Sequence, residues 1–195
     1  MLDLPVSDTM VEETRSELFA NHTWTVTDRI SLESGLRYEF SEIEQTGDTE
    51  QSRSFTYAKP SFTLNYRQDD QNRYRVTLRR DVAQLNFGRF ASQVDLTDNN
   101  STLGNPDYVP QRTWTLEGEW ERRFGDGSFS LVIGYDSVED LDGWVPIESN
   151  GSVFDAPGNI GDGSNFRVTT NITTPLDNLG LTNGVLDVCL AWCDP

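Results

Sequence analysis

The chain has 195 residues, which is enough for one domain with a sizeable core. Its formal net charge of −17 argues against nucleic-acid binding, because a phosphate backbone is bound by clusters of Lys and Arg. Only 35% of the residues are hydrophobic, yet 11% are aromatic, so the composition excludes simple disorder and suits strands with one face in water.

Apolar and polar residues alternate with a period of two along most of the chain, which predicts β-strands rather than helices. We expect residues 1–14 to form a disordered or loop leader. They do not resemble a signal peptide, because acidic residues occur where a basic start and an apolar stretch would be expected. The remaining domain, 15–195, is predicted to hold strands near 15–26, 29–42, 54–67, 73–80, 112–123, 128–138, 165–174 and 185–193.

Short and long connections alternate between these predicted strands. The long ones cover about 45–53, 81–111 and 139–164, and each of the other connections is short. All long loops should therefore leave the same end of the sheet. Barrels of bacterial outer membranes sort their loops in this way, with short periplasmic turns and longer external loops.

Strand length and charge indicate that the apolar faces of the strands contact lipid rather than a protein core. The predicted strands run to roughly 10–14 residues, whereas strands most often have about 5–6 and membrane strands need about 9–11. The polar faces carry rows of charge, which a water-filled lumen tolerates: Arg73, Arg75 and Arg79 on one strand and Glu117, Glu119 and Glu121 on another. We predict an all-β fold, an antiparallel up-and-down transmembrane β-barrel segment of about eight strands. The alternatives are a soluble secreted β-sandwich that binds carbohydrate and a small self-contained outer-membrane barrel.

The run from Leu78 to Phe124 resembles the C-terminal β-barrel region of TonB-dependent outer-membrane receptors. The residues that carry this resemblance are Gly104, Asn105, Pro106, Val109, Pro110, Glu119 and Trp120. SGLRYEF (34–40) and KPSFTLNYR (59–67) also resemble strands of that family, and the likeness covers about 15–187. The family implies a barrel larger than eight strands, an N-terminal plug domain and a segment that engages TonB. Since neither of the last two is visible here, the resemblance implies a partial chain.

The resemblance also implies a function. Receptors of this family sit in the bacterial outer membrane and take up a scarce ligand, such as an iron chelate, a cofactor or a glycan, with energy supplied through the TonB system. Lipid, TonB and the plug domain would be the partners, and the small-molecule ligand stays unknown. We expect no enzyme activity, since the single histidine, His22, falls on an apolar face and no nucleophile or phosphate-loop motif occurs.

Candidate ligand-binding residues lie in the two longest loops. Arg89 could clamp a carboxylate or an iron chelate, or pair with Asp95 or Asp98. Trp144 and Phe154 could stack on a ligand, or pin their loop to the barrel rim. The lumenal charges are expected to offset one another across neighbouring strands: Arg37, Arg73, Arg75, Arg79, Glu117, Glu119 and Glu121.

No cofactor or metal is expected. Cys189 and Cys193 would stand about 13 Å apart in a strand at roughly 3.3 Å per residue, beyond the reach of a disulfide, and two cysteines make a poor metal site.

Overall fold

The protein is described by a computed structural model. It covers residues 9–47, 50–84, 93–95, 100–102, 105, 107–149, 152–177 and 180–195. No helix long and apolar enough to cross a membrane occurs in this part of the chain.

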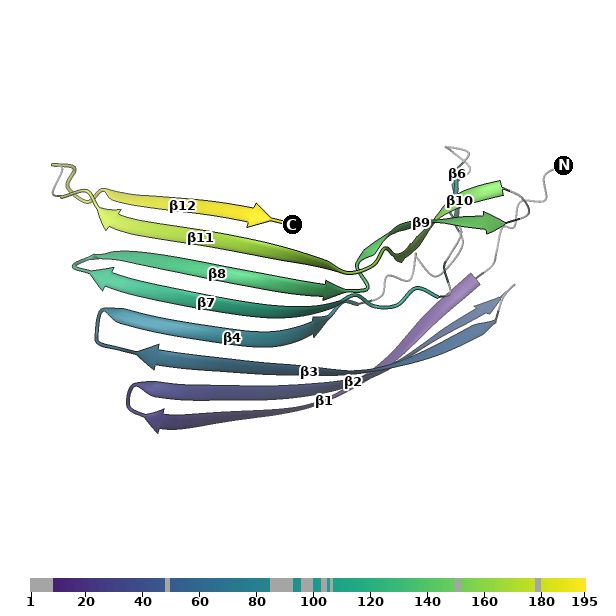
Figure 1. Cartoon of the computed structure of the whole chain (residues 1–195), viewed down its shortest axis with the longest axis horizontal. Helices are drawn as coiled ribbons and strands as arrows, with labels where there is room; N and C mark the ends of the chain where they lie inside the picture. The colour runs from purple at the N-terminus through teal and green to yellow at the C-terminus, as the bar shows by residue number, and fades with distance from the viewer. Residues whose placement is uncertain are drawn as a thin grey trace.

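Eight strands form one antiparallel sheet, and each pairs with its neighbours in chain order (Figure 1). These are β1 (Thr9–Thr27), β2 (Ile30–Gly47), β3 (Gln51–Arg67), β4 (Asn72–Val82), β7 (Arg112–Phe124), β8 (Gly127–Glu139), β11 (Gly163–Pro175) and β12 (Val185–Asp194). Each predicted strand range overlaps one of them. The predicted antiparallel up-and-down arrangement of about eight strands is confirmed.

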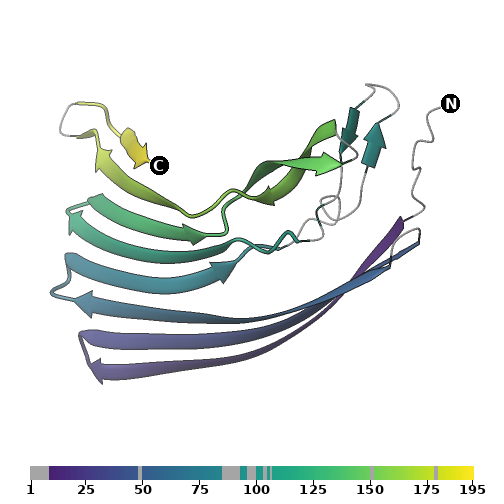
Figure 2. The same cartoon turned by 45° about the vertical axis from the view of Figure 1, so that its right-hand side comes forward.

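The sheet is strongly curved and open (Figure 2). Among the described residues, the first strand pairs with β2 alone and the last with β11 alone. The self-contained small barrel is therefore wrong for this structure, because the two outermost strands do not meet. The β-sandwich is wrong as well, since no second large sheet packs on the first in the described part of the chain.

Three strands are longer than the sequence predicts. β1 starts at Thr9, where a loop leader was expected up to residue 14, and Thr14 pairs with Glu42. β2 continues to Gly47 and β3 begins at Gln51, so both strands extend into the loop that was expected near 45–53. The polar composition there resembles a loop, but the antiparallel pairing of β2 with β3 continues as far as Gln45 and Gln51. Residues 1–8 lie outside the described part of the chain.

The two longest connections contain short hairpins instead of plain loops. The connection after β4 holds β5 (Gln93–Asp95) and β6 (Asn100–Thr102), and the one after β8 holds β9 (Asp142–Ser149) and β10 (Ser152–Asn159). Both leave the same end of the main sheet, opposite the short turns (Figure 1). The two longest connections therefore leave one end of the sheet as predicted, but the third predicted long connection, near 45–53, is short, and the strand pairs inside the long ones were missed.

The short turns are closed by local polar contacts. Asp69 accepts backbone hydrogen bonds from Gln71 at 2.8 Å and Asn72 at 2.6 Å. Together with the side-chain amide of Asn72, the largest cause, these bonds hold the pKa of Asp69 below its ordinary value. Gly125 has a φ of 55°, a conformation that a residue with a side chain adopts only with strain, and it turns the chain between β7 and β8.

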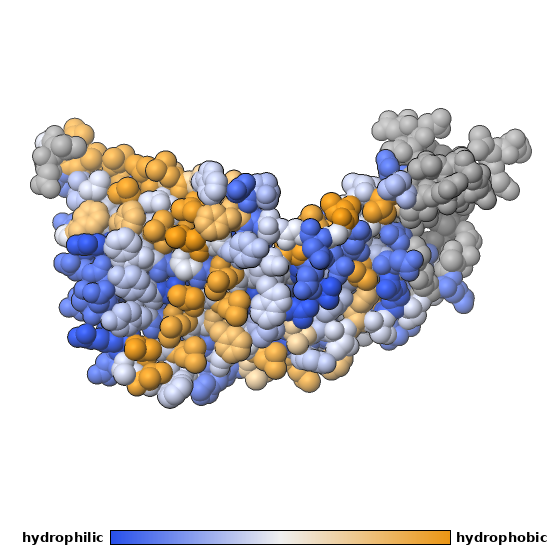
Figure 3. Space-filling view, in the orientation of Figure 1, coloured by the Kyte–Doolittle hydropathy of each residue, from blue (hydrophilic) through white to orange (hydrophobic). Residues whose placement is uncertain are grey.

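The two faces of the sheet differ sharply in chemistry. On one face, apolar residues pair across the strands, as Leu64 does with Val76 and Leu116 with Tyr135. Hydrophobic side chains gather over the middle of the strands, and hydrophilic ones lie at the turn end of the strands below β11 and β12 (Figure 3). We call this the apolar face and the opposite one the polar face. Many large side chains of the apolar face are exposed, Leu18 and Trp192 among them.

Aromatic rings cross the apolar face near the short turns. The ring of Tyr74 stacks between those of Tyr66, at 6.0 Å, and Trp120, at 6.4 Å between centroids. Trp120 in turn meets the Phe129 ring edge-on at 5.3 Å. These four residues lie on four neighbouring strands of the sheet, β3, β4, β7 and β8. At the other end, Tyr38 and Phe40 contact each other at 5.0 Å.

Candidate functional site

The polar face is built from charged side chains that alternate with apolar ones along each strand, so that charges on neighbouring strands come into contact. Lys59 of β3 is the centre of a first cluster. Its ammonium lies 2.8 Å from a carboxylate oxygen of Glu17 in β1 and 2.6 Å from one of Glu39 in β2. Glu39 is only 6% exposed, so its charge depends on this contact.

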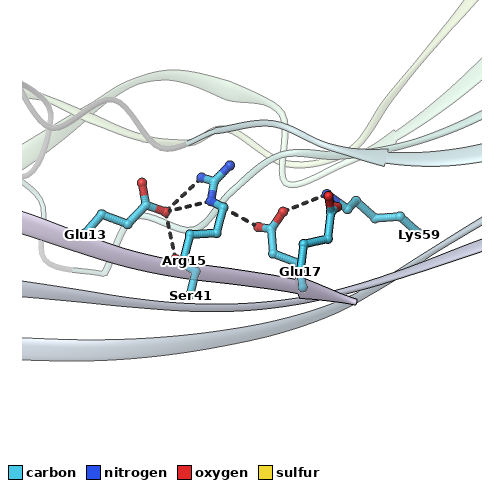
Figure 4. Close-up of polar contacts among 6 residues, drawn as sticks. Glu13, Arg15, Glu17, Ser41 and Lys59 are labelled. Atoms are coloured by element: carbon cyan, nitrogen blue, oxygen red, sulfur yellow. Dashed lines mark hydrogen bonds and ion pairs between the residues drawn. The ribbon is translucent and has the colours of Figure 1, made fainter. Parts of the chain in front are cut away.

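The same cluster continues along β1 toward the long loops. Arg15 lies 2.8 Å from Glu13 and 3.8 Å from Glu39, and the Ser41 hydroxyl donates a 2.8 Å hydrogen bond to Glu13. Figure 4 shows Glu13, Arg15 and Glu17 side by side on one side of β1, with Lys59 reaching the same region. The ion pairs connect three strands on the polar face.

A second cluster joins β7, β8 and β11. Arg167 forms a 2.8 Å ion pair with Glu117 and a further ion pair with Asp136. Asp136 also accepts a 2.7 Å hydrogen bond from the Thr115 hydroxyl, and Thr115 is 3% exposed. Arg167 lies across Gly134, where a Cβ would stand 2.7 Å from the guanidinium carbon. A glycine at this position therefore makes room for the arginine.

The predicted offsetting of lumenal charges is found across strands at some positions and within strands at others. Arg75 pairs with Glu119 of the neighbouring strand at 3.1 Å. Arg79 pairs instead with Asp81, and Glu121 with Arg123, each two residues along its own strand at 2.8 Å. The polar face is thus largely neutralised by internal pairs.

At the end with the long connections, the chain before β7 folds back onto the polar side of β1–β3. Tyr108 is 5% exposed and packs against Ile43 and Phe55. Ile43 is on the same face as Glu39 and Ser41, since alternate residues of a strand share a face. Val109 completes the cluster. We call residues 107–111 the mouth segment.

Asn159, the last residue of β10, fixes the mouth segment. Its amide oxygen accepts a 3.0 Å hydrogen bond from the Val109 backbone N–H, and its amide nitrogen donates to the Val109 carbonyl at 3.0 Å and the Asp140 carbonyl at 2.7 Å. One side chain thereby joins three segments that are far apart in sequence. The sequence analysis missed both Asn159 and Tyr108. The available signal was the aromatic side chain of Tyr108 among residues that favour turns.

The structure describes the three predicted ligand-binding residues to different extents. Arg89 lies outside the described residues. Trp144 is 58% exposed on β9, where it pairs with Pro157. The backbone of Phe154 pairs with Ile147 in the same hairpin, but its side chain lies outside the described part of the structure.

Within the described residues, no group of three or more His, Cys, Asp or Glu side chains is arranged to hold a metal ion. Cys189 and Cys193 are both exposed, free thiols on β12.

A family model described as TonB dependent receptor-like, beta-barrel matches residues 3–180. Solved structures agree with it in fold. A copper transporter, OprC, superposes with a TM-score of 0.72 at 13% identity, over 94% of this chain and 29% of the transporter. The FrpB iron transporter of Neisseria meningitidis gives a TM-score of 0.69 at 15% identity, over 95% of this chain and 26% of FrpB.

The hemophore receptor HasR of Serratia marcescens, solved with its hemophore HasA and heme, gives a TM-score of 0.69 at 12% identity. There the match covers 83% of this chain and 32% of HasR. The chain thus spans between 26% and 32% of the length of these three proteins. No curated protein matches it in sequence.

Proposed function

The chain belongs to the family of TonB-dependent receptor-like β-barrels, and on this premise we propose that it forms part of the wall of a bacterial outer-membrane receptor. The receptor takes up a scarce ligand with energy passed through TonB. One observation carries the proposal for this chain: a single layer of eight strands with a neutralised polar face and a broad, exposed apolar face.

Such an apolar face needs a covering. Exposed apolar area of this extent is unfavourable in water, and it marks a surface that meets lipid or another molecule. Along β7 the apolar face carries charge only at its two ends, Arg112 and Arg122. Ten residues at about 3.3 Å each, tilted by roughly 40°, span about 25 Å, the height of the apolar band of a barrel in lipid. Lipid is therefore the covering that fits the height of the band.

The rows of aromatic rings support the same orientation. Tyr66, Tyr74, Trp120 and Phe129 would lie at the periplasmic boundary of the bilayer, where amphipathic rings are favoured. Tyr38 and Phe40 would lie near the outer boundary. The short turns then face the periplasm, and the hairpins β5–β6 and β9–β10 face the outside.

The ligand would be met at the outer end, where the mouth segment and the β9–β10 hairpin lie together. The solved relatives are named as transporters of copper and iron and as a receptor for a heme-carrying hemophore. Iron chelates, cofactors and glycans are the ligand classes that we propose to test, with Arg89, Trp144 and Phe154 as candidate contacts. The role of this chain is to form the wall and part of the mouth, without bond-breaking chemistry. TonB and a plug domain are the proposed partners.

Fractionation and uptake in the native bacterium test this proposal. The full-length protein should appear in the outer-membrane fraction and require detergent for extraction. Uptake of one compound in a panel of ferric chelates, heme, copper and oligosaccharides should fall equally when the gene or tonB is deleted. A detergent-free soluble protein, or uptake that depends on the gene but not on TonB, would contradict the proposal.

A further inference from the structure

The apolar face contains a groove over β4, β7 and β8. Its volume is about 510 Å³, and its lining includes Tyr74, Leu116, Gly118, Trp120, Ile133 and Tyr135. The strands that form its floor are paired on both sides, β7 with β4 and with β8. No strand edge is therefore available there to pair with an incoming peptide backbone.

Gly118 creates the groove. On β7 it stands between Leu116 and Trp120 in the row of residues that point to the apolar face, and its cross-strand partners are Val76 and Ile133. A Cβ at this position would meet nothing within 4 Å. Hence neither backbone conformation nor close packing requires a glycine here. Its effect is to leave a hollow between aromatic and branched side chains, a shape that a flexible hydrocarbon chain can fill.

A positively charged residue lies beyond the turn end of the groove, two positions after the lining residue Trp120. Arg122 follows Trp120 on the same face and is exposed. The carboxylate of Asp69 interacts electrostatically with Arg122, but its hydrogen bonds are made with Gln71 and Asn72 of its own turn. At the opposite end of β7, the guanidinium of Arg112 is held by two carboxylates, Asp140 and, at 3.3 Å, Glu139. An anionic group is thus favoured at the turn end of the groove rather than at the loop end.

We propose that the groove binds one acyl chain of an anionic glycerophospholipid, with the lipid head group at Arg122. The inference rests on the proposed function, because lipid reaches this face only if the sheet lies in a membrane. The apolar lining and the cation at its end are complementary to the two parts of one amphipathic molecule. Free phosphate would match Arg122 but leave the groove empty.

Native mass spectrometry of the detergent-purified full-length protein tests the proposal, with phosphatidylglycerol as the titrant and phosphatidylcholine as the zwitterionic comparison. Gly118→Leu fills the groove without opposing the backbone. Arg122→Gln removes the cation, and Ser34→Leu adds the same apolar bulk on β2 as a matched control. A heat-dependent gel shift confirms that each variant is folded.

We expect Gly118→Leu to lower the apparent affinity for phosphatidylglycerol about tenfold, since several buried methylene groups lose their contacts. Arg122→Gln should lower it about threefold and reduce the preference over phosphatidylcholine, and Ser34→Leu should match the parent. Unchanged binding by Gly118→Leu, or a changed number of protein copies instead of bound lipid, would overturn the groove as a lipid site. A protein that needs no detergent would instead contradict the proposed function itself.

Discussion

Gly134 and Arg167 illustrate how one residue without a side chain can organise several charges. The guanidinium of Arg167 lies across Gly134 and contacts Glu117 and Asp136 on two strands. A methyl group at position 134 would displace the flexible end of Arg167, which costs little by itself. The larger cost is the loss of the ion pairs that the arginine makes from that position.

We therefore predict that Gly134→Ala destabilises the folded protein by about 1 kcal/mol, because the lost charge-assisted bonds outweigh the gain from a stiffer unfolded chain. Gly118→Ala is the matched control, since its methyl group would meet no neighbour. It should be neutral or stabilise by about 0.4–1 kcal/mol. Urea unfolding in detergent micelles measures both. Equal effects of the two substitutions would show that Arg167 does not depend on Gly134.

The ion pairs of Lys59 can be tested in the same way. Lys59→Met leaves two carboxylates, Glu17 and the buried Glu39, without their ammonium partner. We expect a loss of about 2–3 kcal/mol in the free energy of unfolding, since one partner of a largely buried pair is removed. Adding Glu39→Gln to that variant should restore part of the loss, as the uncompensated buried charge then disappears. If the double variant loses as much free energy of unfolding as Lys59→Met and Glu39→Gln lose in sum, the two residues are not coupled.

At the scale of elements, the mouth segment depends on contacts between distant parts of the chain. Tyr108 is buried against β2 and β3, and Asn159 of β10 bonds the backbone of Val109. We expect Asn159→Ala to increase hydrogen exchange at residues 107–111 and leave β7 protected, because three hydrogen bonds are lost outside the main sheet.

Asn171→Ala is the control for that experiment. Asn171 makes a 3.2 Å hydrogen bond to Ser130 on the polar face, far from the mouth segment in the register of the sheet. Exchange at 107–111 should not change in this variant. Unaltered protection of those residues in Asn159→Ala would show that packing of Tyr108 alone holds the segment.

The strands could be predicted because their signal is local. Alternation along β7, from Trp114 to Trp120, sets both the extended conformation and the two faces, and antiparallel neighbours follow from the short turns. The mouth segment could not be predicted in the same way. Whether Tyr108 is buried depends on Ile43 and Phe55, which are more than fifty residues away in the chain. Likewise, nothing next to Gly134 in the sequence indicates that an arginine from β11 lies over it.

For the whole molecule, the chemistry of the two faces supports the proposed orientation in a membrane. A sheet of eight strands, charged and internally paired on one side and apolar on the other, is the wall of a barrel and not a layer of a soluble sandwich. Its open edges and curvature fit the family to which the chain belongs. We therefore expect the apolar face to contact lipid and the polar face to contact an aqueous lumen.

Cysteine accessibility along β7 distinguishes a lipid-facing side chain from a lumenal one. In outer membranes containing the full-length protein with Cys189→Ser and Cys193→Ser, single cysteines at successive positions from 116 to 119 are treated with a charged maleimide. We expect reaction at Glu117→Cys and Glu119→Cys and protection at Leu116→Cys and Gly118→Cys, a period of two. Equal reaction at all four positions, or the opposite alternation, would contradict it.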